Sequence, residues 1–145
     1  MNKEFIPYEQ ALELKELGFG EKCLGFYYTD NQINNKDGLY DVRKTFVIDA
    51  FQSMEGDSDS YFVNTEDRVD YIAAPLYPQA FRWFREKYDL HAYVDSMRLT
   101  TGETVYDYVI TITDGEESDD GKNWRTYEEA ELACIIKLIE IAKNK

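Results

Sequence analysis

The sequence YPQAF at residues 77–81 repeats YEQAL at residues 8–12, and YEEA at residues 127–130 is a looser third copy. Each copy opens a stretch whose apolar residues have helical spacing. After a short break, the first two copies are followed by aromatic-rich segments of the kind that forms β-strands. The pattern therefore predicts two helix-plus-strands units and a closing helix.

The neighbouring sequence sets the limits of these elements. Pro7 suits a first helical turn, and Gly18 is a natural C-terminal stop for the first helix. Thr101-Gly102 separates two strand-forming segments and predicts an antiparallel hairpin. The expected helices are residues 7–17, 76–88 and 126–143, and the expected strands are residues 23–29, 45–51, 90–97 and 105–113.

The order of these elements is α-β-β-α-β-β-α. Hairpins that follow helices predict an antiparallel sheet with the helices packed on one face, which is an α+β fold. At 145 residues the chain has the length of one domain, so we expect residues 1–145 to form a single α+β domain. The repeated order of elements raises the hypothesis of an internal duplication, and shared helix-start chemistry is the simpler alternative.

Side-chain periodicity also predicts which faces are buried. The second helix carries one apolar stripe, and so does the last helix. Thr126 and Glu129 have the spacing of a capping box at the start of the last helix. In the strand at 105–113, the expected core face carries Tyr106, Tyr108, Ile110 and Ile112, and the alternate residues Val105, Asp107, Val109 and Thr111 lie on the other face. The expected stripes are Tyr77, Ala80, Phe81, Phe84 and Tyr88, then Ala130, Cys134, Ile135, Leu138, Ile139 and Ala142.

The net charge of −13 comes from two segments of the chain. Residues 49–70 hold seven acids and one base, and residues 103–120 hold seven acids and no base, so the remaining residues are neutral overall. This sign of charge disfavours direct binding of DNA or RNA. The acidic segments are either solvated loops or a surface for a basic partner. The residues proposed for partner binding are Asp57, Asp59, Glu116, Glu117, Asp119 and Asp120.

The sequence also limits the cellular context that we expect. No apolar run approaches the roughly 20 residues that a membrane helix requires. The N-terminus lacks the apolar region of a signal peptide. Cys23 and Cys134 lie far apart and form no CxxC pair, which favours a reducing compartment. We therefore expect a cytoplasmic protein without a membrane anchor.

Three blocks carry a resemblance to a known family: FIPYEQALELKELGF at residues 5–19, APLYPQAFRWFREKY at 74–88 and TYEEAELACIIKLIE at 126–140. They resemble a family of small uncharacterised proteins encoded by tailed bacteriophages of gut bacteria. The resemblance covers the helical segments, roughly a third of the chain. It implies a phage product that acts in the cytoplasm of an infected bacterium, with helices as the scaffold and variable loops between them. It implies no activity, cofactor or catalytic residue.

Residues that could carry out catalysis are few. His91 is the only histidine, which is too few for a metal site of ordinary spacing, so we expect no metal and no cofactor. His91 is expected to be structural or exposed, and Cys134 to be buried because it lies on an apolar stripe. Cys23 has only Lys22 nearby in sequence to lower its thiol pKa. No GxSxG or HExxH motif is present, so we expect a protein that is not an enzyme.

One cluster indicates a ligand site. Arg82, Trp83 and Arg85 lie close together on the second helix, and arginine with an aromatic ring can hold a phosphate or a nucleotide base. The simpler interpretation is a solvated helix face that pairs with the acidic loops.

Three binding functions follow from these observations. The first is a non-enzymatic accessory protein that binds a host protein through its variable acidic loops. The second is a protein that binds or sequesters a small ligand, such as a nucleotide. The third is an acidic mimic of nucleic acid, which requires residues 49–70 and 103–120 to lie on one face.

Overall fold

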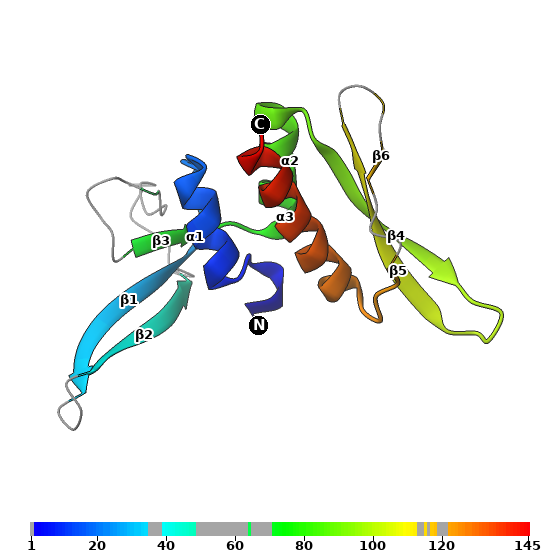
Figure 1. Cartoon of the computed structure of the whole chain (residues 1–145). Helices are drawn as coiled ribbons and strands as arrows, with labels where there is room; N and C mark the ends of the chain where they lie inside the picture. The colour runs from blue at the N-terminus through cyan, green and yellow to red at the C-terminus, as the bar shows by residue number, and fades with distance from the viewer. Residues whose placement is uncertain are drawn as a thin grey trace, which may run out of the picture. The chain divides into compact units, whose positions relative to one another are not determined.

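The computed structural model describes residues 2–34, 39–48, 64, 71–112, 115, 117–118 and 122–145 (Figure 1). The chain divides into two compact units. The N-terminal unit is Phe5–Leu76, and the C-terminal unit is Tyr77–Lys145 together with residues 1–4. A short 3-10 turn, η1 (Asn2–Glu4), precedes the first α-helix.

The N-terminal unit contains α1 (Tyr8–Glu16), β1 (Gly25–Asn34), β2 (Leu39–Ile48) and β3 (Tyr71–Ala74). The strands form an antiparallel sheet in the order β2-β1-β3, and α1 packs beside β3 (Figure 1). The segment Phe5–Ile6 pairs with Leu76–Pro75, because the Ile6 N–H donates to the Pro75 carbonyl at 2.9 Å.

The end of α1 follows from Gly18. Its φ of 92° lies in the left-handed region, where a side chain is strained. The Phe19 N–H then donates back to the Leu14 carbonyl at 2.9 Å, and the Gly18 N–H donates to the Lys15 carbonyl at 3.0 Å. This is the Schellman pattern, and the buried side chains of Phe19 and Leu14 complete it. The stop predicted at Gly18 is confirmed.

The polar stretch 30–44 differs from the sequence expectation. The sequence predicts a polar loop there with a turn at Asp37-Gly38, but β1 continues to Asn34 and β2 begins at Leu39. Asp30 pairs with Arg43, and Asn34 pairs with Leu39. Backbone pairing holds these polar residues in strands, which a pattern based on side chains does not detect. The turn itself lies outside the described residues, and so do residues 61–63, where the sequence YFV also predicts a short extended piece.

The C-terminal unit contains α2 (Tyr77–Tyr88), β4 (His91–Arg98), β5 (Thr104–Thr111), β6 (Glu117–Ser118) and α3 (Tyr127–Lys143). Its sheet is antiparallel in the order β4-β5-β6, and α3 packs on β5 and β4 and against α2 (Figure 1). Gly102 has a φ of 90° in the turn between β4 and β5, where the sequence predicts the hairpin.

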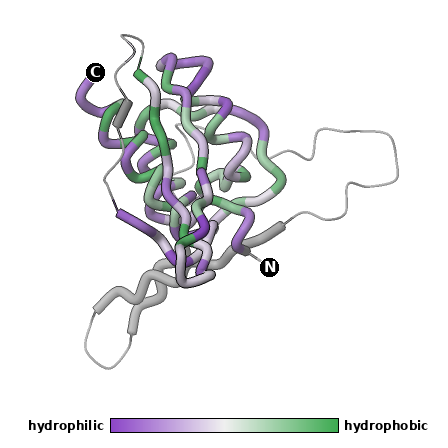
Figure 2. Tube along the Cα trace, turned by 90° about the vertical axis from the view of Figure 1, so that its right-hand side faces the viewer, coloured by the Kyte–Doolittle hydropathy of each residue, from purple (hydrophilic) through white to green (hydrophobic). Residues whose placement is uncertain are grey.

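The expected stripe of α3 is confirmed, because all six of its residues are buried. In α2, Tyr77, Ala80 and Phe84 are buried as expected, whereas Phe81 and Tyr88 are half-buried. On the face of the hairpin that the alternation selected, Tyr108 and Ile110 are buried, and Tyr106 and Ile112 are half-buried. The apolar part of α3 gives way to a hydrophilic C-terminal end in Figure 2. The α+β class and the order of elements are therefore confirmed, with the strands divided between two antiparallel sheets.

Candidate functional site

The register of the β4–β5 hairpin places two carboxylates directly opposite each other. Asp95 pairs with Asp107, and Met97 pairs with Val105. Because side chains alternate along a strand, these four residues lie on the face opposite Tyr108 and the core. We call this surface the outer face; its residues are His91, Tyr93, Asp95 and Met97 from β4 and Val105, Asp107, Val109 and Thr111 from β5.

The outer face exposes large apolar side chains. Tyr93 is 55% exposed and Met97 is 54% exposed, although both lie within a regular strand. Val105 and Val109 are half-buried beside them. In the described part of the chain, therefore, one side of this sheet is covered by α3 and the other presents aromatic and apolar groups to solvent.

The hydrogen bonds of the neighbouring backbone explain how the carboxylates are held. The Tyr106 N–H donates to the Trp124 carbonyl at 2.9 Å, and the Trp124 N–H donates to the Tyr106 carbonyl at 2.7 Å. The backbone N–H and C=O groups of Tyr106 therefore point away from β4. The backbone N–H and C=O groups of the next residue, Asp107, point toward β4. By the same alternation, the N–H of Ser96 points to the open edge of β4.

Each carboxylate accepts one of these outward N–H groups. Asp95 Oδ1 accepts from Ser96 N at 2.8 Å, and Asp107 Oδ1 accepts from Tyr108 N at 2.8 Å. The two N–H groups lie on opposite sides of the strand pair, so the bonded oxygen of each carboxylate turns away from the other strand. Among the described residues, no cationic side chain pairs with either carboxylate, and no hydrogen bond reaches the second oxygen of either one.

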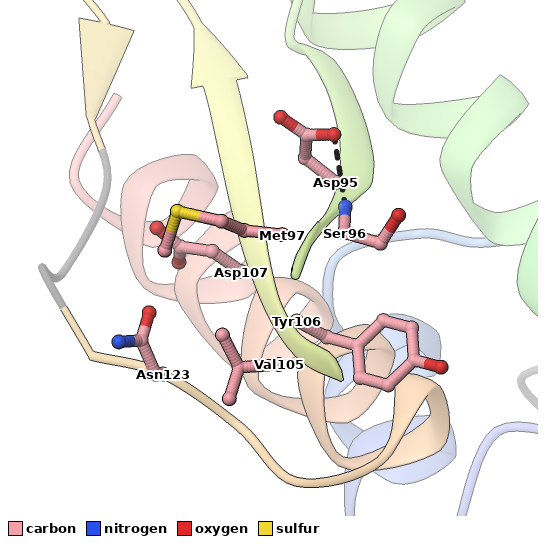
Figure 3. Close-up of a pocket in the computed structure, with 7 residues that line it drawn as sticks. All are labelled: Asp95, Ser96, Met97, Val105, Tyr106, Asp107 and Asn123. Carbon is pink, nitrogen blue, oxygen red and sulfur yellow. Dashed lines mark hydrogen bonds between the residues drawn. The ribbon is translucent and has the colours of Figure 1, made fainter. Parts of the chain in front are cut away.

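A shallow pocket of about 120 Å³ opens at this point of the sheet. Its lining is Asp95, Ser96, Met97, Val105, Tyr106, Asp107 and Asn123. Figure 3 shows Met97, Asp107 and Val105 on one side of β5, with Asn123 facing them, while the Tyr106 ring points the other way. Pockets for drug-sized ligands measure about 300–1,000 Å³. This pocket is therefore large enough for one small polar head group and too small for a nucleotide.

The charge of the outer face is negative. It contains Asp95 and Asp107 and no lysine or arginine. His91 lies at one end, where its Nε2 is 2.9 Å from Asp89 Oδ1, and both side chains are more than half exposed. The face can therefore attract a cation by charge and an apolar group by burial.

The ligand cluster proposed on α2 has a different geometry. Arg82 and Arg85 are exposed, but Trp83 is only 6% exposed and packs edge-on against Phe84 and Tyr88. The apolar stripe expected for α2 does not include Trp83, whereas the structure buries this side chain in the core. The Lys87 ammonium also lies 4.9 Å from the Trp83 ring centre. The Trp83 ring is therefore engaged in core contacts and is not exposed for stacking on a nucleotide base.

The proposed partner-binding acids are mostly outside the described residues. This holds for Asp57, Asp59, Glu116, Asp119 and Asp120. Glu117 lies in β6, where it pairs with Thr111 of β5 at the far edge of the same sheet. The prediction that these acids bind a partner stays a prediction. A nucleic acid mimic requires residues 49–70 and 103–120 to lie on one face. This arrangement also lies outside the described residues, because Asn64 is the only residue of 49–70 that the structure describes.

The cysteines have the environment of core residues. Cys23 is 1% exposed and Cys134 is fully buried, and both are free thiols. Burial, with a smaller contribution from Glu131, raises the pKa of the Cys134 thiol, which disfavours the reactive thiolate. The expectation that Cys134 is buried is confirmed.

One carboxylate on α3 has an altered proton affinity. Burial raises the pKa of Glu131 to about 7, and the nearby Glu128 carboxylate adds to this effect. Burial and Glu131 also raise the pKa of Tyr127, which contacts Tyr106 edge-on at 5.9 Å. Glu131 therefore titrates near neutral pH.

The described residues contain no group of three or more His, Cys, Asp or Glu side chains placed to hold a metal ion. Of the helices that the structure describes, none has both the length and the apolar character required to cross a bilayer.

Comparison with known protein families, curated proteins and solved structures finds no match. The candidate site therefore rests on the geometry of this chain alone.

The outer face is not apparent from the pattern of one strand. Alternation puts Val105, Asp107 and Val109 on the side opposite the expected core residues, but it does not pair them with β4. The turn at Thr101-Gly102 carries the missing signal, because counting outward from it places Asp95 opposite Asp107. A like-charge pair at such a position is unfavourable for stability and is therefore informative.

Proposed function

We propose that this chain is a non-enzymatic phage accessory protein that binds a host protein in the bacterial cytoplasm. The observation that carries the proposal is the outer face of β4 and β5, where Tyr93 and Met97 are exposed beside two carboxylates that no described cationic side chain pairs with. Exposed aromatic and methionine side chains in a polar surround are characteristic of protein interfaces. The acidic segments at 49–70 and 103–120 add a field of the same sign.

The alternative function is binding or sequestration of a small ligand, such as a nucleotide, through Arg82 and Arg85. It has less support, because Trp83 is buried and the pocket on the outer face measures about 120 Å³. A stabilising ligand raises the melting temperature by mass action, so a thermal-shift screen of nucleotides tests this alternative. A flat screen eliminates it. The third hypothesis, an acidic mimic of nucleic acid, has no support from the described residues.

The test of the proposed function is a pull-down from host lysate with quantitative mass spectrometry. The bait proteins are the wild type, a Tyr93→Ser/Met97→Ser variant and the control Ile136→Ser. Ile136 lies on α3 and is 47% exposed, so the control removes a comparable apolar group from a different surface. We expect one host protein with the wild type and with Ile136→Ser, and loss of that protein with the double variant. No enriched protein, or equal enrichment by all three baits, contradicts the proposal.

A further inference from the structure

The outer face carries two carboxylates, and none of its own residues is a lysine or an arginine. Asp95 and Asp107 are cross-strand neighbours, and like charges at such positions destabilise a sheet. Each carboxylate uses one oxygen for a neighbouring backbone N–H, and the other oxygen has no partner among the described residues. Asn123 contributes an amide to the same pocket. A single ammonium or guanidinium group placed here would face two carboxylates.

The flanks of this pocket are apolar. Met97 and Val105 form part of its wall, and Tyr93 and Val109 continue the outer face beyond it. The flat face of two paired strands suits an extended segment, whose side chains also alternate with a period of two residues. A segment with a cationic residue between apolar residues matches this pattern of charge and contact.

The open edge of β4 is a poorer place for the same segment. Edge strands are commonly protected by charged side chains. Here the Asp95 carboxylate already accepts the outward N–H of Ser96, so a strand added at the edge would meet an occupied donor and a negative charge. The face is thus the more accessible surface of the hairpin.

Other occupants fit this charge less well. A second copy of the chain would bring further carboxylates to the pair, and the net charge of −13 opposes such self-association. Anionic lipid and nucleic acid phosphates are repelled for the same reason.

We infer that the outer face binds an extended basic and apolar segment of the partner protein, with one lysine or arginine side chain seated between Asp95 and Asp107. The inference rests on the proposed function and names the chemistry of the partner. Apolar contacts with Tyr93 and Met97 supply contact area, and the two carboxylates select the charge of the segment.

The experiment uses short blocked peptides and the full chain. A peptide that alternates lysine and valine is titrated into ¹⁵N-labelled protein, and a peptide that alternates glutamate and valine serves as the control. We expect shifts of the amide signals of Tyr93, Met97 and Asp107 with the lysine peptide only. Salt at about 1 M, where the Debye length is about 3 Å, should abolish most of this binding.

Two double variants that each remove two negative charges test whether Asp95 and Asp107 bind the lysine peptide. Asp95→Asn/Asp107→Asn keeps the acceptor oxygens for the Ser96 and Tyr108 N–H groups, so we expect it to fold and to weaken the lysine peptide about tenfold. The control Glu9→Gln/Glu86→Gln removes two exposed charges elsewhere and should bind like the wild type. Equal weakening in both double variants overturns the inference, because a non-specific field would then explain the binding.

The outcomes separate this inference from the proposed function. No shifts on the outer face, equal binding of the glutamate peptide, or shifts that depend on protein concentration through self-association would each overturn the inference. The proposed function stands in that case if the host protein is still captured and is lost with Tyr93→Ser/Met97→Ser. Capture that also disappears with Asp95→Asn/Asp107→Asn supports both.

Discussion

At the scale of the residue, the Asp95–Asp107 pair combines an unfavourable contact with an exposed position. The hairpin would be more stable with a neutral side chain at either position, because opposite like charges repel. Residues that break a local rule in this way are expected at functional sites, where binding compensates the cost. The same pair therefore links a stability measurement to the proposed binding surface.

We expect Asp107→Asn to raise the free energy of unfolding by about 0.5 kcal/mol at low salt. The amide oxygen can still accept the Tyr108 N–H, so only the charge is removed. Asp95→Asn should have a similar effect, and the double variant should add little more, because one neutral partner already removes the repulsion. Urea unfolding at low and high salt measures these changes. A destabilised Asp107→Asn protein would contradict the assignment.

Glu131 gives a second prediction, which concerns pH. Its pKa is raised from 4.5 to about 7 by burial and by Glu128, so the native state holds the proton more tightly than the unfolded state. The stability that this provides is fully present below about pH 4.5 and is lost as the pH rises through about 7. We expect Glu131→Gln to remove this loss and to be the more stable protein above neutral pH.

The difference should be about 1 kcal/mol or less, since solvent screens a half-buried carboxylate. Urea unfolding across this pH range measures it, and Glu86→Gln, at an exposed position on α2, is the control. Parallel pH profiles for the wild type and Glu131→Gln would contradict the prediction.

At the scale of the element, the start of α3 depends on its capping box. The Glu129 N–H donates to Thr126 Oγ1 at 3.2 Å, and the Thr126 N–H donates to Glu129 Oε2 at 3.3 Å. We expect Thr126→Ala to lower the free energy of unfolding by about 1 kcal/mol, because it leaves a helix N–H without its acceptor. Thr126→Ser keeps the hydroxyl and should stay near the wild type. Chemical denaturation followed by circular dichroism compares the three proteins, and equal loss in both variants would contradict the role of the hydroxyl.

The elements differ in how far their sequence predicts them. The buried stripe of α3, the capping box at Thr126 and the core face at Tyr108 follow from local patterns, and the structure confirms them. The extent of β1 and β2 does not, because the residues near Asp30 are polar and are held by backbone pairing. β3 was missed because a strand of four residues, ending in Ala73 and Ala74, has too little periodicity to detect.

The candidate site was predictable in its parts but not in its assembly. Periodicity alone placed Asp107 on the solvent side of its strand. The burial of Trp83 was not predicted, because this residue lies at the margin of the α2 stripe and packs edge-on against Tyr88. The partner of Asp107 depends on strand register, which the hydrophobic pattern and the turn determine together.

At the scale of the whole molecule, the two units repeat one arrangement and then diverge. Each has a helix followed by an antiparallel hairpin: α1 with β1 and β2, and α2 with β4 and β5. The third strand then joins different partners, since β3 pairs with the first hairpin strand and β6 pairs with the second. A duplication therefore accounts for the helix and the hairpin of each unit and does not account for the third strand. The duplication itself stays a hypothesis.

The two cysteines give a direct test of how these units unfold, because Cys23 lies in the N-terminal unit and Cys134 in the C-terminal unit. Both thiols are buried, so a thiol reagent reaches each one only when its surroundings open. Separate cores give separate opening free energies, so we expect the two thiols to be labelled at different rates in low concentrations of urea. Mass spectrometry of the digested protein follows both sites in the unmodified sequence. Equal rates with the same urea dependence would instead mean that the chain opens as one cooperative domain, the behaviour that its length predicts.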